Sequence, residues 1–124
     1  MKKIMGLFLS MLLLTGCGNA AASYRQISQE EAAKLMESME DVIILDVRTP
    51  EEYKTGHIKG AVNLPNETIG KEDIPMLPRK DQTILVYCRS GNRSKQASSK
   101  LAALGYTDIR EFGGINTWRG ETEQ

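Results

Sequence analysis

Two continuous apolar runs dominate the hydrophobic pattern of the chain. Residues 42–45 and 83–87 are mostly aliphatic or β-branched, which is typical of strands that are covered on both faces of a sheet. Weaker runs at 62–64 and 108–112 predict two further short strands. The folded part opens at Tyr24, and residues 24–120 are expected to form one domain.

The first predicted helix follows directly after this opening segment. Ser28 and Glu31 have the spacing of a capping box, in which the two residues satisfy each other's backbone N–H groups. Apolar residues then recur at helical spacing and form one stripe: Ala32, Leu35, Met36 and Met39.

Glycines mark the ends of the next two predicted helices. Thr49 and Glu52 form a second capping box, and Gly56 ends the short helix that follows it. A longer helix is expected between residue 88 and Gly105, and three apolar residues lie on one of its faces: Ala97, Leu101 and Leu104.

Strands that alternate with helices predict an α/β fold, here a small and mainly parallel sheet flanked by helices on both faces. The segment 65–80 contains three prolines and mixed charge, so we expect a loop with at most one helical turn. The pair Gly113 and Gly114 predicts a turn into a short amphipathic piece at 115–118. Residues 121–124 are expected to be a C-terminal tail.

The beginning of the chain has the pattern of an export signal. Lys2 and Lys3 precede an apolar stretch at 4–14, which is too short for a stable membrane span and has the length of a signal-peptide core. It closes with Leu14-Thr15-Gly16-Cys17, which resembles the bacterial lipobox, whose cysteine is acylated and becomes the first mature residue. A signal peptide with an incidental cysteine is the alternative.

The lipobox resemblance implies a lipoprotein signal peptide at 1–16 and a lipidated tether at 17–23. Cys17 would then carry the lipid and anchor the domain to a bacterial membrane outside the cytoplasm. With Cys17 blocked, Cys88 is the one free thiol of the chain, and no intrachain disulfide is possible.

Charge and histidine content exclude several classes of partner. Lys and Arg number 16, as do Asp and Glu, so there is no basic excess and nucleic acid is not an expected partner. The single histidine, His57, has no histidine or cysteine partner at metal-ligand spacing, so we expect neither a metal site nor a cofactor.

The most distinctive chemistry lies where the apolar run at 83–87 reaches Cys88 and a polar, helix-forming segment follows at once. This order places a thiol at the carboxyl end of a strand, where ligands bind in parallel α/β sheets. A helix N-terminus and nearby arginines favour the thiolate. The loop N–H groups of residues 89–94 are expected to turn inward toward an anion.

Cys88 is therefore predicted to be a nucleophile. The alternative is a core cysteine, which would not need these polar neighbours.

Three signatures occur in the order of a known family. The first is the strand end Asp46-Val47-Arg48 with Glu51 and Tyr53, and the second is the turn Gly56-His57-Ile58-Lys59-Gly60-Ala61. The third is the loop from Cys88 to Ser94 with Gly113, Gly114 and Trp118 downstream. Together the residues from about Tyr24 to about Gly120 resemble the rhodanese-like domain, a single-domain sulfurtransferase fold.

This resemblance implies sulfur transfer through a persulfide. The Cys88 thiolate would attack the sulfane sulfur of a small anionic donor such as thiosulfate, and a thiophilic acceptor would remove that sulfur, cyanide in an assay and a thiol in the cell. The residues implied to bind substrate are Arg89, Ser90, Gly91, Asn92, Arg93 and Ser94. Asp46 and Arg48 are implied to tie loops together, His57 to belong to a turn, and Trp118 to pack under the active loop.

Other functions remain open at this stage. A rhodanese-fold sulfur carrier or binding module with low turnover would keep the same loop. Phosphatases and arsenate reductases of related architecture separate their cysteine and arginine by five residues, whereas Cys88 and Arg93 are separated by four, and Tyr87 stands where phosphatases commonly carry histidine. Thiol–disulfide exchange is disfavoured because no second cysteine is present to resolve a mixed disulfide.

Overall fold

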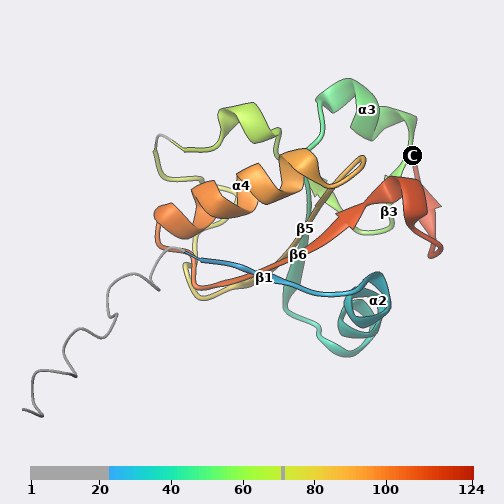
Figure 1. Ribbon diagram of the computed structural model, residues 1–124, viewed down its shortest axis with the longest axis horizontal. Coiled ribbons are helices and arrows are strands. Elements are labelled where there is room, and N and C mark those ends of the chain that lie inside the picture. Colours follow the sequence, from blue (N-terminus) through green and yellow to red (C-terminus); the bar gives the residue numbers. More distant parts are fainter. Residues whose placement is uncertain (1–22, 71) are drawn as a thin grey trace, which may run out of the picture.

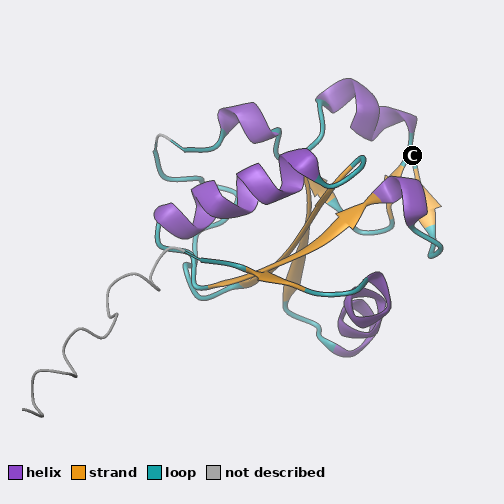
Figure 2. Cartoon of the chain, in the orientation of Figure 1, coloured by secondary structure: helices purple, strands orange, loops and turns teal. Residues whose placement is uncertain are grey.

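Five parallel strands form the main sheet, in the spatial order β1–β6–β5–β2–β4 (Figures 1 and 2). The computed structural model describes residues 23–70 and 72–124. The strands are β1 (Arg25–Gln26), β2 (Val42–Asp46), β4 (Val62–Asn63), β5 (Thr83–Cys88) and β6 (Asp108–Gly114). The predicted leader peptide, the predicted tether up to residue 22 and Cys17 lie outside the described residues.

Helices cover both faces of the sheet, which confirms the predicted α/β architecture. Helix α4 (Asn92–Ala103) lies on one face and α2 (Gln29–Ser38) on the other (Figure 1). The central strand β5 supplies both cores by alternation. Ile84 and Val86 pack on the α4 side, whereas Leu85 and Tyr87 pack on the α2 side. Because β5 is buried over its whole length, its position is fixed, and so is the residue at its carboxyl end.

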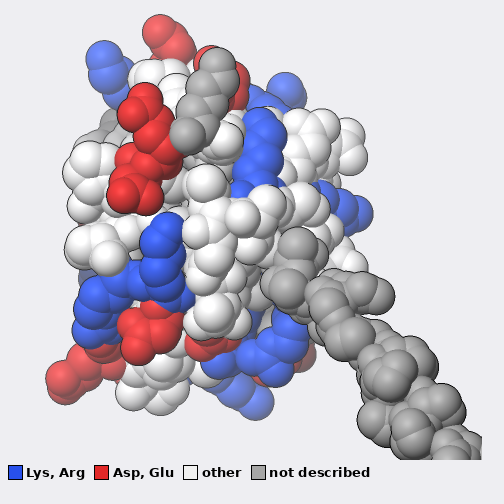
Figure 3. Space-filling view, turned by 90° about the vertical axis from the view of Figure 1, so that its left-hand side faces the viewer, with Lys and Arg blue, Asp and Glu red and all other residues white. Residues whose placement is uncertain are grey.

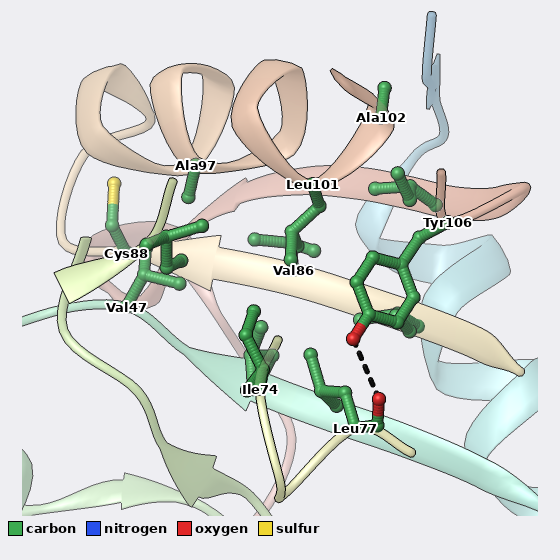
Figure 4. Packing of buried hydrophobic residues seen from close by; sticks show 13 residues of the cluster. Val47, Ile74, Leu77, Val86, Cys88, Ala97, Leu101, Ala102 and Tyr106 are labelled. Atoms are coloured by element: carbon green, nitrogen blue, oxygen red, sulfur yellow. Dashed lines mark hydrogen bonds between the residues drawn. The ribbon is translucent and has the colours of Figure 1, made fainter. Parts of the chain in front are cut away.

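One predicted capping box forms completely: Thr49 and Glu52 make both of its bonds at the start of α3 (Pro50–Thr55). At the start of α2 only the Ser28 half of the predicted box is present among the described residues, where the Ser28 side chain accepts the Glu31 N–H. Within 65–80, residue 71 apart, the helical piece is the single 3-10 turn η2 (Asn66–Thr68). The loop of this region contributes apolar side chains to the core under α4 (Figure 4).

The predicted turn at Gly113 and Gly114 is wrong, because β6 continues through both glycines and aligns Gly114 with Cys88. A β-bulge between Val86 and Cys88 accompanies this pairing. A Cβ on Gly114 would lie 2.0 Å from the Arg89 carbonyl oxygen. The glycine is therefore required by the close approach of the active loop and not by a change of chain direction. The 3-10 turn η3 (Ile115–Thr117) follows.

The last residues pair with the body of the domain. Strand β7 (Thr122–Glu123) runs antiparallel to β3 (His57–Ile58) in a second, two-stranded sheet. The Lys59 N–H also donates to the Glu121 carbonyl. Residues 121–124, which were expected to form a tail, are thus held against the segment that follows α3. The strand β7 consists of only two polar residues, so the sequence gives no signal for it.

The surface carries both signs of charge. On the face drawn in Figure 3, acidic and basic side chains lie interspersed. Within residues 23–70 and 72–124, no helix is long and apolar enough to cross a membrane.

Candidate active site

Cys88 is the last residue of β5, and its sulfur lies at the start of α4 (Figure 4). Val47 and Ala97 are its labelled apolar neighbours in that view. The Gly91 N–H donates to the sulfur at 3.0 Å, and the thiol is 3.4 Å from the Ser94 hydroxyl oxygen. The sulfur therefore has polar contacts on the loop side and apolar contacts on the core side.

The local chain geometry leaves the start of α4 open for an anion. Gly91 is the N-cap residue and has a left-handed backbone (φ +113°), and no side chain caps the helix there. Residues with a Cβ rarely adopt this conformation. The first N–H groups of a helix have no partner within the helix, and the helix dipole adds partial positive charge at this end. The Cys88 sulfur thus lies where a capping group or bound anion would be stabilised.

The sulfur is more deeply buried than the sequence indicates. Cys88 is 1% exposed, and Gly91 and Ser94 are buried with it, whereas Arg89, Ser90 and Asn92 are exposed. Attack on a donor requires the reacting atoms to approach to about 3–3.5 Å. Loop residues must therefore shift before a donor can reach the sulfur.

The two loop arginines have different surroundings. The Arg93 guanidinium makes two bonds to the Glu52 carboxylate, at 2.7 and 3.1 Å. These bonds from Arg93 are the main reason why the pKa of Glu52 falls to about 2. Arg89, in contrast, is exposed, and within the described part of the chain its side chain has no hydrogen bond or ion pair. Arg93 is committed to α3, and Arg89 is the loop cation free to meet a ligand.

Glu111 is a site residue that the sequence analysis missed. It is 2% exposed and accepts the Ser94 hydroxyl proton at 2.5 Å, the Gly113 N–H at 3.0 Å and the Gln26 amide at 3.1 Å. The sequence did contain a hint of this role. Ile109 and Glu111 are two residues apart in a strand and therefore lie on the same face, and Ile109 packs in the core on the α4 side. A charged residue at such a position is unusual.

A buried polar network supports the loop from the neighbouring strand. Arg48 makes a bidentate ion pair with Asp46 and also donates to the Gly56 carbonyl at 2.7 Å. The Tyr87 hydroxyl donates to Asp46 at 2.6 Å and accepts the Ile58 N–H. Burial, followed by the hydrogen bond to Asp46, raises the pKa of Tyr87. Asp46 and Arg48 thereby join the ends of β2, α3 and β5 and do not contact the Cys88 sulfur.

His57 and Trp118 lie away from the thiol. The His57 ring stacks on Tyr53 with centroids 3.7 Å apart. Trp118 packs against Phe112 on the α2 side of the sheet, so the expectation that it packs under the active loop is wrong, since Cys88 lies on the α4 side. Among the described residues there is no group of three or more His, Cys, Asp or Glu that could hold a metal ion.

Comparisons with known proteins find relatives in both sequence and fold. The sequence profile of the rhodanese-like domain matches residues 28–121. Thiosulfate sulfurtransferase PspE of Escherichia coli is 38% identical over 71 residues, which span 57% of this chain and 68% of that protein. Thiosulfate sulfurtransferase GlpE of Pseudomonas entomophila is 33% identical over 83% of this chain and 95% of its own. A solved structure described as "rhodanese with anions from E. coli" superposes with a TM-score of 0.61 at 33% identity, covering 66% of this chain and 96% of that one.

Proposed function

Because the chain belongs to the rhodanese-like domain family, we propose that it transfers a sulfane sulfur from thiosulfate or a related donor through a persulfide on Cys88. The chain is a rhodanese-type sulfurtransferase, and its reaction requires a sulfur donor and an acceptor. The observation that carries the finer proposal is the position of the Cys88 sulfur at the uncapped start of α4, with the Gly91 N–H directed at it.

The proposed reaction has two covalent steps. The Cys88 thiolate attacks the sulfane sulfur of thiosulfate, a new S–S bond forms, and the S–S bond to sulfite breaks with its electron pair on sulfite. A thiophilic acceptor then attacks the outer sulfur of the persulfide, and the electron pair of that bond returns to Cys88. Cyanide is the acceptor of the assay and a thiol is the proposed acceptor in the cell. Such covalent catalysis divides one difficult transfer into two easier displacements.

The start of α4 stabilises the charge that moves in both steps. The persulfide and the departing sulfite are anions, and the N–H groups of the loop and the first helical turn are fixed donors for such charge. The Gly91 N–H already makes one such bond to the sulfur.

Intact-protein mass spectrometry tests this proposal directly. Treatment of the protein with thiosulfate is expected to add one sulfur atom to Cys88, and cyanide is expected to remove it as thiocyanate. A mass that stays unchanged under saturating thiosulfate, together with no thiocyanate, would contradict the proposal.

Replacement of Arg89 by alanine is expected to raise the KM for thiosulfate with little change in kcat. Arg89 is exposed and has no protein partner, so it supplies charge for binding an anionic donor and not support for the loop. An exposed ionic contact is worth up to about 1 kcal/mol, which corresponds to about a fivefold change in KM. Steady-state cyanolysis at low salt measures the effect.

Arg79→Ala is the matched control for that experiment. Arg79 precedes β5 at the opposite end of the strand and pairs with Asp41. This change removes the same charge far from the loop and should leave KM unaltered. Equal KM values for the Arg89 variant and the parent would show that Arg89 does not bind the donor.

The burial of Cys88 favours a second candidate, a sulfur carrier with low turnover. A thiol that is 1% exposed holds a persulfide away from solvent, and a partner could open the loop on docking. Rapid turnover of thiosulfate and cyanide by the isolated domain would contradict this candidate. A phosphatase-like role is less consistent, because the arginine that would bind the oxyanion, Arg93, is held by Glu52.

We also propose that the protein is a lipoprotein anchored to a bacterial membrane through Cys17. The lipobox-like order of residues 14–17 after a basic and apolar leader supports this proposal. In the host cell, the parent chain is expected in the membrane fraction and Cys17→Ala in the soluble or secreted fraction. Equal fractionation of the two chains would contradict the lipid anchor.

A further inference from the structure

A buried carboxylate lies two hydrogen bonds from the Cys88 sulfur. Ser94 Oγ is 3.4 Å from the sulfur and donates to Glu111 Oε2 at 2.5 Å. The three side chains come from β5, α4 and β6, and all are at most 2% exposed. The oxygens of Glu111 accept two further bonds, from the Gly113 N–H and from the Gln26 amide.

Glu111 accepts three hydrogen bonds that compensate part of the cost of its burial, but its charge is not balanced by a cation of the described chain. Burial of a carboxylate is unfavourable unless a cation or hydrogen bonds compensate it, and among the described residues no lysine or arginine pairs with Glu111. An apolar side chain would fill the same position on the strand face, as Ile109 does two residues earlier. The hydrogen bond from Ser94 connects this carboxylate to the Cys88 sulfur.

The hydrogen-bond directions define a path for a proton. A serine hydroxyl has one proton, and three acceptors lie around that of Ser94: the Glu111 carboxylate at 2.5 Å and the carbonyls of Gly91 at 3.0 Å and Gly113 at 3.4 Å. The carboxylate takes the proton because its bond is the shortest and charge-assisted bonds are the stronger ones. The Ser94 oxygen is then left with lone pairs, and the Cys88 thiol donates to that oxygen. The thiol, the hydroxyl and the carboxylate form one directed chain.

We propose that Glu111 accepts the proton of the Cys88 thiol through the Ser94 hydroxyl. The S–H bond breaks and its electron pair stays on sulfur, while the thiol proton moves to Ser94 Oγ and the former Ser94 proton moves to Glu111 Oε2. The products are a thiolate, a serine that now donates to it, and a neutral glutamic acid that donates to Ser94. Glu111 is thus a positioning residue that acts on the nucleophile through Ser94.

Glu111 also borders a surface groove. The groove has a volume of about 340 Å³ and is lined by Ser90, Gly91 and Lys95 as well, while Glu111 itself is 2% exposed. The charged groups that face the cluster are Lys95 in this groove and Arg93 with its partner Glu52 beside the thiol. The side chain that β1 presents to Glu111 is the neutral Gln26.

This inference rests on the proposed role of Cys88 as the nucleophile, and the rate of persulfide formation tests it. The rate is measured by rapid quenching and mass spectrometry with thiosulfate, from acidic to alkaline pH. Glu111→Gln keeps the shape of the side chain and removes the proton acceptor. We expect persulfide formation to slow by about 10²-fold near neutral pH, and the deficit to shrink as pH rises, because hydroxide then removes the thiol proton directly.

Two more variants and a control separate this role from a structural one. Ser94→Ala should show the same pH-dependent loss, and the double variant should be no slower than the slower single one, because both residues serve one path. Asp108→Asn is the control, since Asp108 accepts the Thr83 hydroxyl at 2.7 Å at the other end of β5 and β6. The Asp108→Asn protein should form the persulfide at the parental rate at every pH.

The outcomes distinguish this inference from the proposed function. If Cys88 still accepts sulfur but Glu111→Gln lowers the rate of persulfide formation by the same factor at every pH, or not at all, the proposed proton path is wrong. If the parent accepts no sulfur, the proposed function fails. The pH dependence of Cys88 alkylation by iodoacetamide in the same variants then still decides the proton path, because alkylation needs the thiolate and the same loop opening but no sulfur donor.

Discussion

Replacement of Cys88 by serine is expected to abolish sulfur transfer. The serine hydroxyl occupies nearly the same space, so the Gly91 N–H and Ser94 keep a partner and the fold is retained. An alkoxide is not accessible near neutral pH, and oxygen cannot carry the sulfane sulfur as a persulfide. Removal of a catalytic nucleophile lowers turnover by orders of magnitude, so thiocyanate formation should fall to background, at least about 10³-fold.

Two measurements on the Cys88→Ser protein distinguish loss of the nucleophile from loss of the fold. Intact mass after thiosulfate should equal the untreated mass, and thermal unfolding should occur close to the parental temperature because the change is nearly volume-conserving. Retained thiocyanate formation by a folded Cys88→Ser protein would rule out the persulfide mechanism.

Replacement of Asp46 by alanine is expected to cause the largest loss of stability among the changes considered. Asp46 is fully buried and is the common acceptor for Arg48 and Tyr87. Removal of one member of a buried ion pair leaves an uncompensated charge and costs about 3–5 kcal/mol. Urea unfolding should show this loss as a lower midpoint with an unchanged slope.

Asp41→Ala provides the comparison for Asp46. Asp41 also pairs with an arginine, at 2.8 Å, but both side chains are exposed, so solvent screens the pair and the loss of stability should be much smaller than for Asp46→Ala. Activity of the Asp46 variant at low temperature should fall as well, since the network joins the segments beside the active loop. A loss below about 1 kcal/mol for Asp46→Ala would mean that Arg48 and Tyr87 find other partners.

The parts of the fold predicted from sequence are those determined by local pattern. The runs at 42–45 and 83–87 became β2 and β5, because short β-branched and aliphatic runs are typical of covered strands. β5 is buried along its whole length, whereas β2 is fully buried only at its carboxyl end. The capping pairs at Ser28 and Thr49 marked helix starts because their bonds join residues three positions apart. The placement of Cys88 at a strand end before α4 followed from the same local rules.

The parts that were missed depend on contacts between distant segments. Glu52 and Arg93 are 41 residues apart, and no local pattern shows that they neutralise each other. The pair Gly113 and Gly114 has the composition of a turn, yet Gly114 is required by the close approach of the Arg89 backbone. The sequence analysis did not single out Glu111, because its burial depends on β1 on one side of β6 and on Ser94 of α4.

The parallel order of the strands determines which way the domain faces when it is held by its beginning. The described chain enters β1 at the amino ends of the parallel strands, and β5 runs in the same direction, so the thiol lies at their carboxyl ends (Figure 1). Ser23 and the thiol therefore lie at opposite ends of the strands. A surface attached directly at Ser23 would be on the side of the domain away from the active loop.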